Sequence, residues 1–192
     1  SESPAPGGGS IAAYIGSLGA SLGAMVANLS AHKPGWDDRW EEFSDWAVKG
    51  QEIKDRLLEL VDEDTASFKA IMNAFGMPKG SEEEKRARTS AIQEATRYAT
   101  LVPFRTMEAA FASLDVIKAM VEKGNPNSIT DAGVGALCAR SAVLGAWMNV
   151  RINVKGLEDK TFVADLLKRG NEMALKVQEK ENEILRIISE KL

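Results

Sequence analysis

The chain has 192 residues, 44% hydrophobic and 27% charged, which suffices for one domain with a substantial core but not for two ordinary domains. Its formal net charge of −4 argues against sequence-independent binding of nucleic acid, because such binding requires cations that neutralise phosphates. From this length we expect a single domain over residues 1–192. The single cysteine, Cys138, cannot form an internal disulfide, so we expect a reducing, cytoplasmic setting.

A loop rich in proline and glycine precedes the first apolar segment. Pro4-Ala5-Pro6 leads into three glycines, Gly7, Gly8 and Gly9, and Ser10 stands where a helix N-cap would stand. Consecutive glycines permit positive φ and remove side chains from the path of the backbone. The N–H groups of such a loop favour an anionic or electron-rich ligand above the helix. The alternative interpretation is a flexible leader.

The first apolar segment carries no charge between Ser10 and Ala31 and is long enough to cross a membrane. Its many Gly, Ala and Ser residues, however, are typical of a helix buried within a bundle, so we expect no membrane partner. Gly16, Gly19 and Gly23 recur at helical spacing and allow another helix to approach closely.

The remaining apolar periodicity predicts four further helices. Their expected ranges are Trp36 to Phe75 with a possible break at Gly50, Ser81 to Lys123, Ser128 to about Val154, and Asp159 onward. Pro103 removes a backbone hydrogen bond and predicts a kink in the third helix. No segment alternates with period two for long enough to be a strand. The fold class is therefore all-α, a multihelical bundle of about five long helices.

Three polar residues fall on apolar helix faces. Asp64 lies in the phase of the apolar stripe of its helix, where burying a carboxylate is costly unless it is paired or used. A partly exposed acid at the edge of the stripe is the alternative. Asn149 and Asn153 are four residues apart on a face of small residues, so their amides can share a partner. They predict a site or a buried polar network.

Together these motifs resemble the formiminotetrahydrofolate cyclodeaminase family. That family includes the cyclodeaminase half of formiminotransferase-cyclodeaminase and the related methenyltetrahydrofolate cyclohydrolases. The motifs that carry the resemblance are the loop at residues 4–10, Leu60-Val61-Asp62-Glu63-Asp64 with Phe68, Met77-Pro78-Lys79, Gln93 through Val102-Pro103, Gly124-Asn125, Asp131-Ala132 and Asn149-Val150-Arg151-Ile152-Asn153. Two departures are the absence of the short helix that usually precedes the loop and of the formimino-transferring domain.

The resemblance implies an ammonia-lyase of histidine degradation that converts formimino-tetrahydrofolate to methenyltetrahydrofolate and ammonia. It requires no metal and no redox cofactor. A buried carboxylate would act as general acid and base and would stabilise the cationic product, and Asp131 and Asp64 are the two candidates. The alternatives left open are a methenyltetrahydrofolate cyclohydrolase and a non-catalytic helical dimerisation module.

The same resemblance implies a set of residues that bind the folate substrate. Asn149 and Asn153 would hydrogen-bond the edge of the pterin, and the loop formed by Gly7, Gly8, Gly9 and Ser10 would admit its flat ring. Lys33 and Arg88 are candidate partners for the acidic glutamyl tail.

The small-residue stripes of the first and fourth helices predict a homodimer or higher oligomer, because one chain has few partners able to cover both. Asp131 and Asn149 share a helix but lie 18 residues apart, roughly 27 Å along its axis. One small ligand cannot contact both from a single straight helix. We therefore expect a site at the subunit interface that takes residues from two chains.

Overall fold

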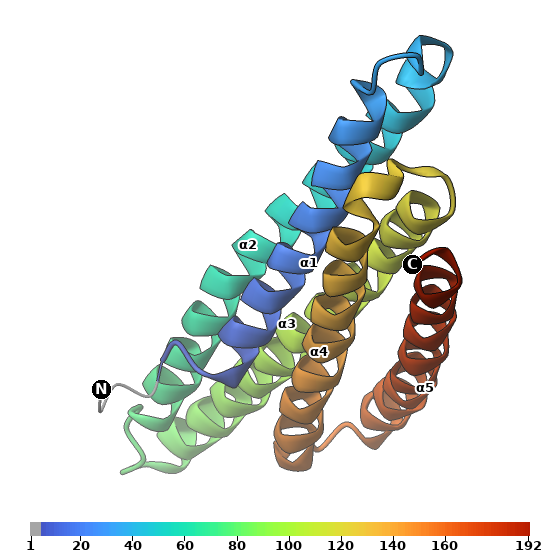
Figure 1. The fold of residues 1–192 in the computed structure, drawn as a ribbon. Helices are drawn as coiled ribbons and strands as arrows, with labels where there is room; N and C mark the ends of the chain where they lie inside the picture. Colours follow the sequence, from blue (N-terminus) through green and yellow to red (C-terminus); the bar gives the residue numbers. More distant parts are fainter. Residues whose placement is uncertain (1–4) are drawn as a thin grey trace.

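The computed structural model describes residues 5–192, and these form five long helices without a strand (Figure 1). The helices are α1 (Gly8–Ala31), α2 (Trp40–Phe75), α3 (Glu82–Lys123), α4 (Ile129–Asn153) and α5 (Lys160–Lys191). Single 3₁₀ turns lie at Asp37–Arg39, Pro126–Ser128 and Val154–Gly156. The all-α prediction is confirmed. Pro4, part of the predicted loop motif, lies outside the described residues.

The helix boundaries follow local signals in the sequence. Ser81 and Glu84 form the predicted capping box, in which Ser81 Oγ accepts from the Glu84 N–H at 3.1 Å and the Glu84 carboxylate accepts from the Ser81 N–H at 3.0 Å. The possible break at Gly50 does not occur. A Cβ at Gly50 would lie 2.9 Å from the Ala24 Cβ, so this glycine permits close packing of α2 against α1 instead.

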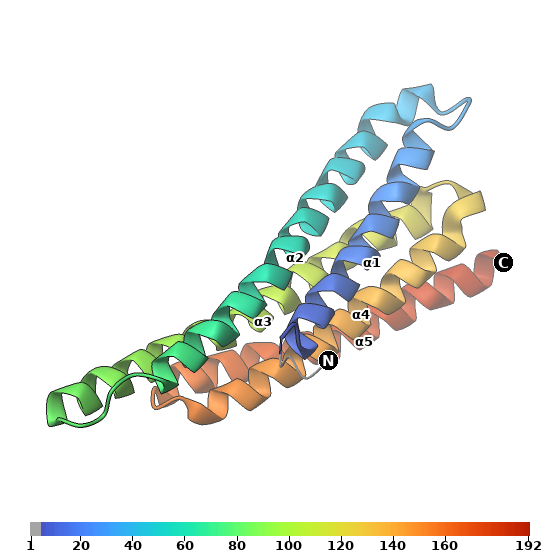
Figure 2. The ribbon, with the colours of Figure 1, turned by 90° about the vertical axis from the view of Figure 1, so that its left-hand side faces the viewer.

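Helices α1 to α4 pack side by side, and α5 covers α3 and α4 (Figure 1). Helices α1 and α4 run in opposite directions. Figure 2 shows that the hairpin of α2 and α3 extends beyond the start of α1. The beginning of α1 therefore meets the middle of this hairpin and the last turns of α4.

The small residues of α1 and α4 pack against each other within one chain. A Cβ at Gly19 would lie 2.8 Å from the Gly135 carbonyl oxygen, and a Cβ at Gly16 would lie 3.2 Å from the Ala142 Cβ. The expectation that these two stripes need a second chain to cover them is therefore wrong, since each covers the other. Helix α1 is long and apolar enough to cross a membrane, and 61% of its most apolar window is buried inside the bundle.

The outer sides of α1 and α4 carry bulky apolar residues that nothing in the described chain covers. Both helices contact α3 behind them, so their outer sides form one surface, which we call the front face (Figure 1). Its members are 38–69% exposed: Ile11, Tyr14, Leu18, Met25 and Leu29 on α1, and Val134, Leu137, Met148 and Ile152 on α4.

Alanine at Gly19 should lower the free energy of unfolding by about 1–3 kcal/mol, because its Cβ overlaps the backbone of Gly135. Gly145→Ala is the matched control in the same seam, where the new Cβ would meet the Ala12 Cβ at 3.4 Å. This control should retain or raise the stability, because alanine is favoured over glycine in a helix by about 1 kcal/mol. Urea unfolding of both variants measures the difference. Equal stabilities would contradict the close-packing argument.

Candidate functional site

A cleft of about 210 Å³ opens where α1 begins. Four helices and the loop before α1 contribute to its wall. The lining residues are Ala5, Gly7, Gly8, Gly9, Asp64, Ser67, Phe68, Ile71, Ala99, Asn149 and Asn153. The structure thus brings together the predicted glycines, one of the two predicted carboxylates and both predicted asparagines.

Asp64 reaches this cleft from α2 and is held by the first turn of α1. Ser10 Oγ donates a hydrogen bond of 2.8 Å to Asp64 Oδ2. A Cβ at Gly9 would lie 2.7 Å from Asp64 Cγ, so the carboxylate occupies the space that any other residue would fill. The partial positive charge at the start of α1 also favours a carboxylate at this position.

The glycines of this loop are therefore needed because Asp64 approaches the backbone closely, and not because the backbone is left-handed. Gly7 has a φ of −109°, and among residues 5–192 positive φ is found only at Gly35. The prediction of Ser10 as N-cap is also wrong. Gly7 is the N-cap of α1, and Ser10 is the third helical residue, whose buried hydroxyl is bonded to Asp64.

The acidic neighbours of Asp64 are directed elsewhere. Glu63 forms ion pairs with Arg56 at 2.6 Å and with Arg105 at 3.6 Å, which ties α2 to α3. Asp62 is exposed. Of this acidic run, only the carboxylate of Asp64 lines the cleft.

The two asparagines do not share a partner, contrary to the expectation from their spacing. Asn149 Nδ2 donates to the Gly145 carbonyl at 2.9 Å, and Asn153 Nδ2 donates to the Ala99 carbonyl at 2.8 Å. Within the described chain neither Oδ1 accepts a hydrogen bond. The cleft therefore offers two amide oxygens and one carboxylate, a set of acceptors that suits a ligand rich in N–H donors or carrying positive charge.

One wall of the cleft is apolar, and sequence analysis did not assign it to the site. Phe68 and Ile71 of α2 form this wall together with Ala99 of α3. An apolar wall opposite a few polar groups is typical of sites that bind a flat organic ring. The available signal was that Phe68 and Ile71 continue the helical phase of Asp64, although that phase is equally typical of a buried core.

Asp131 does not reach the cleft within one chain. It lies in the first turn of α4, 18 residues before Asn149 and hence roughly 27 Å from it along the helix. It is partly buried and forms no side-chain hydrogen bond or ion pair with any residue of the range 5–192. As the sequence predicted, it cannot share one small ligand with Asn149 of its own chain.

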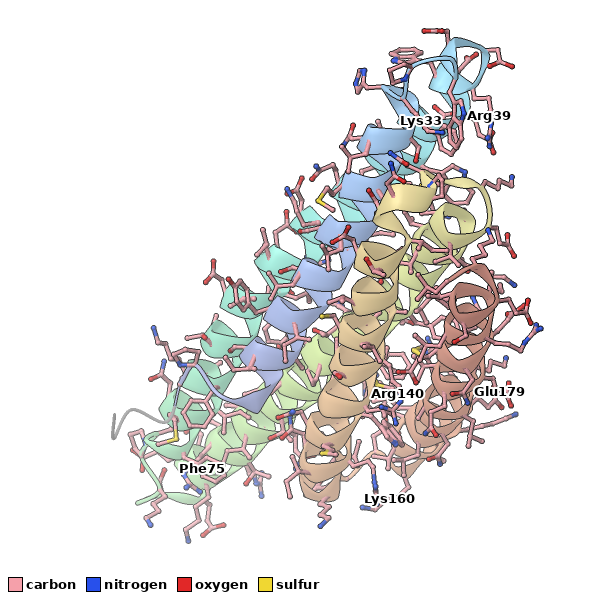
Figure 3. The ribbon with its side chains drawn as sticks, viewed as in Figure 1. Lys33, Arg39, Phe75, Arg140, Lys160 and Glu179 are labelled. Atoms are coloured by element: carbon pink, nitrogen blue, oxygen red, sulfur yellow. The ribbon has the colours of Figure 1, made fainter. Side chains whose placement is uncertain are left out.

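The two predicted cations also lie outside the cleft. Lys33 follows α1 at the opposite end of the bundle, where its Nζ lies 3.9 Å from the centre of the Trp36 ring (Figure 3). Arg88 donates to the carbonyl of Phe75 at 3.2 Å. Phe75 lies one helical turn beyond Ile71 on α2. The expectation that Lys33 belongs to the same substrate site as the glycine loop is therefore wrong within one chain, because the whole length of α1 separates Lys33 from the cleft.

Residues 5–192 contain no group of three or more His, Cys, Asp or Glu side chains placed to hold a metal ion. Cys138 lies beside Gly19, and partial burial raises the pKa of its thiol, which disfavours the reactive thiolate. Asp64 thus remains the ionisable group of the cleft.

The hold of α1 on Asp64 can be tested by combining substitutions. Ser10→Ala should lower the free energy of unfolding by about 1–3 kcal/mol, because it removes a buried hydrogen bond to a carboxylate. In a Gly9→Ala background the same substitution should have a much smaller effect, because the new Cβ displaces Asp64. A Gly8→Ala background is the control, since that Cβ would lie 3.5 Å from Asn149 Nδ2, an ordinary contact. Equal effects of Ser10→Ala in both backgrounds would contradict this arrangement.

Known proteins are similar to this chain in sequence and in fold. Residues 1–172 match the family model described as formiminotransferase-cyclodeaminase. A methenyltetrahydrofolate cyclohydrolase of Methylorubrum extorquens is 38% identical over 168 residues, which cover 88% of this chain and 81% of that protein. A formimidoyltransferase-cyclodeaminase of Rattus norvegicus is 33% identical over 84% of this chain, which spans only 30% of that longer relative.

A solved structure extends the likeness to the fold. The crystal structure of formiminotetrahydrofolate cyclodeaminase from Thermotoga maritima matches with a TM-score of 0.86 and 25% identity, over 98% of this chain and 90% of that one. Family model, relatives and structure confirm the resemblance that the sequence motifs indicated. The chain belongs to the formiminotransferase-cyclodeaminase family.

Proposed function

We propose that this chain is a cytoplasmic formiminotetrahydrofolate cyclodeaminase, an ammonia-lyase that acts in histidine degradation without a nucleic-acid or membrane partner. Relatives that convert folates support an enzyme of folate one-carbon chemistry. The observation that carries the finer proposal is the carboxylate of Asp64, held in a cleft whose other polar side chains present acceptors. A cationic folate intermediate matches that set of groups.

In the proposed reaction, Asp64 moves one proton and faces the charge that develops. The formimino group enters protonated, as a cationic amidinium. The second folate nitrogen attacks its carbon, and the proton of this nitrogen passes to the Asp64 carboxylate as the tetrahedral adduct forms. Asp64 returns this proton to the formimino nitrogen, whose bond to carbon then breaks to release ammonia. The methenyl product carries a positive charge, which the restored carboxylate stabilises. These steps use no metal and no redox cofactor.

The other residues of the cleft would orient the folate. The Oδ1 atoms of Asn149 and Asn153 accept from the N–H edge of the pterin, and Phe68 packs against the ring. Gly8 leaves the approach to Asn149 open. Arg88 bonds to the carbonyl of Phe75, one helical turn beyond Ile71 of the apolar wall, and would meet the glutamyl end of a folate that leaves the cleft on that side.

A methenyltetrahydrofolate cyclohydrolase is the second candidate, because a relative of that name matches this chain over most of its own length. Water would then attack the same carbon, and Asp64 would accept its proton. A non-catalytic dimerisation module is not favoured, since it gives no reason for a carboxylate and two amide oxygens to line a cleft.

Direct assay of both substrates tests the proposal. Formimino-tetrahydrofolate should yield ammonia and the methenyl chromophore together, and Asp64→Asn should slow this reaction by about 10²–10⁴-fold, because the proton-transfer group is lost. Asp62→Asn, at an exposed neighbouring position, is the control and should retain the natural rate. Turnover of methenyltetrahydrofolate alone would favour the cyclohydrolase. Turnover of neither substrate would overturn both candidates.

We further propose that the front face joins two copies of the chain. Its residues are bulky and apolar, and α1 carries no charge between Ser10 and Ala31, so a second copy of the same face is a matching partner. In this face Met148 directly precedes Asn149 of the cleft, and Ile11 directly follows Ser10, which bonds to Asp64. A two-fold axis at right angles to the helices would place each α4 antiparallel to its copy and bring the partner's Asp131 toward Asn149.

Mixing two inactive variants tests this shared site. Asp64→Asn and Asp131→Asn should each be inactive alone, and random reassortment should restore about a quarter of the natural activity, because mixed dimers keep one intact site of two. Leu18→Glu in both chains should abolish the recovery and yield a monomer in sedimentation. Leu175→Glu, at an exposed position of α5, is the control. Heterodimers without recovered activity would confine the site to one chain and leave Asp131 without a catalytic role.

A further inference from the structure

Pro103 lies buried in the middle of α3, a helix of 42 residues. A proline has no N–H, so the carbonyl four residues earlier loses its usual helical donor, and the ring pushes that carbonyl outward. The carbonyl in question belongs to Ala99, which lines the cleft. The proline therefore creates an unpaired acceptor in the wall of the site.

Asn153 supplies the missing donor from another helix. Its Nδ2 donates to the Ala99 carbonyl at 2.8 Å across 54 residues of sequence. Because this bond uses the NH₂ side of the amide, the side chain is turned so that its Oδ1 is the atom available to a ligand. Asn149 contrasts with it, since its NH₂ group bonds to the Gly145 carbonyl of its own helix.

We infer that Pro103 is a positioning residue of the cleft, an inference that rests on the proposed function. By leaving the Ala99 carbonyl without an N–H partner, it anchors the amide of Asn153 with Oδ1 directed to the N–H edge of the folate. The alternative role, a purely structural kink, would not couple Pro103 to the orientation of Asn153. Alanine at position 103 restores the backbone N–H, which competes with Asn153 for Ala99.

Because of this competition, Pro103→Ala should weaken ligand binding without lowering the thermal stability of the chain. Proline is the least favourable residue within a helix, so Pro103→Ala supplies a better helix former and an additional backbone hydrogen bond. Its midpoint of thermal unfolding should not fall, whereas the orientation of Asn153 should be lost. Thr100→Ala is the matched control in the same turn, because the Thr100 hydroxyl donates to the Thr96 carbonyl and not to Ala99.

The first measurement needs no ligand. In the full chain labelled with ¹⁵N at asparagine, the side-chain NH₂ signals of Asn153, assigned by their absence in Asn153→Ala, should exchange slowly with water. Pro103→Ala should accelerate this exchange at least about tenfold, and Thr100→Ala should leave it unchanged. Unchanged exchange in Pro103→Ala would overturn the inference even if the chain binds folate.

The second measurement uses tetrahydrofolate as the probe. Pro103→Ala and Asn153→Ala should each weaken binding about tenfold, and the double variant should be no weaker than either alone. Additive losses, or natural affinity in Pro103→Ala, would overturn the inference. Asn153→Asp provides a further variant if Pro103→Ala does not fold, because it keeps the shape but lacks the NH₂ donor. It should bind as weakly as Asn153→Ala, and natural affinity would overturn the inference. Failure of the natural chain to bind tetrahydrofolate, with slow exchange intact, would instead count against the proposed function.

Discussion

The close approach of α1 to α4 is the constraint on which the rest of the molecule depends. Gly19 and Gly135 face each other without a side chain on either helix, so backbone meets backbone there, and Gly16 meets only the Cβ of Ala142. Such contact gives little hydrophobic area per residue and is stabilised by dense packing instead. A bulkier residue at Gly16 or Gly19 would push the helices apart. The small residues therefore set the separation of the elements that form the cleft.

The cleft lies where this tight seam ends. At the start of α1 the hairpin of α2 and α3 continues outward while α1 does not (Figure 2). The first turn of α1 therefore faces Asp64 on one side and Asn149 on the other. A helix N-terminus carries partial positive charge and free N–H groups, and here a carboxylate of the same chain lies against it. This arrangement keeps a carboxylate beside apolar walls, and no cation of residues 5–192 forms an ion pair with it.

The polar side chains of the cleft have one chemical character, because their donors are used within the protein. Ser10 donates to Asp64, Asn149 to Gly145 and Asn153 to Ala99. What these side chains leave for a ligand is a set of oxygen acceptors. The asparagines share this character because backbone carbonyls accept hydrogen bonds from their NH₂ groups. One of these carbonyls, that of Ala99, lacks its helical N–H donor because residue 103 is proline. Recognition of a donor-rich or cationic ligand thus depends on hydrogen bonds within the protein, in which the ligand takes no part.

The sequence by itself determined the five helices, because caps, glycine stops and apolar periodicity are local signals. It also indicated that Asp64 and the two asparagines fall on apolar or small-residue helix faces, but it left open whether Asp64 is a partly exposed acid, as it is in the structure. Only the tertiary structure decided that the small-residue stripes cover each other, that Gly9 makes room for Asp64, and that Asn153 bonds to Ala99. Each of these contacts joins residues at least 50 positions apart, and a helical period does not tell which face meets which. The same limit explains Lys33 and Asp131, whose types suited a folate. Lys33 follows the end of α1 and Asp131 lies at the start of α4, so both lie at the opposite end of the bundle.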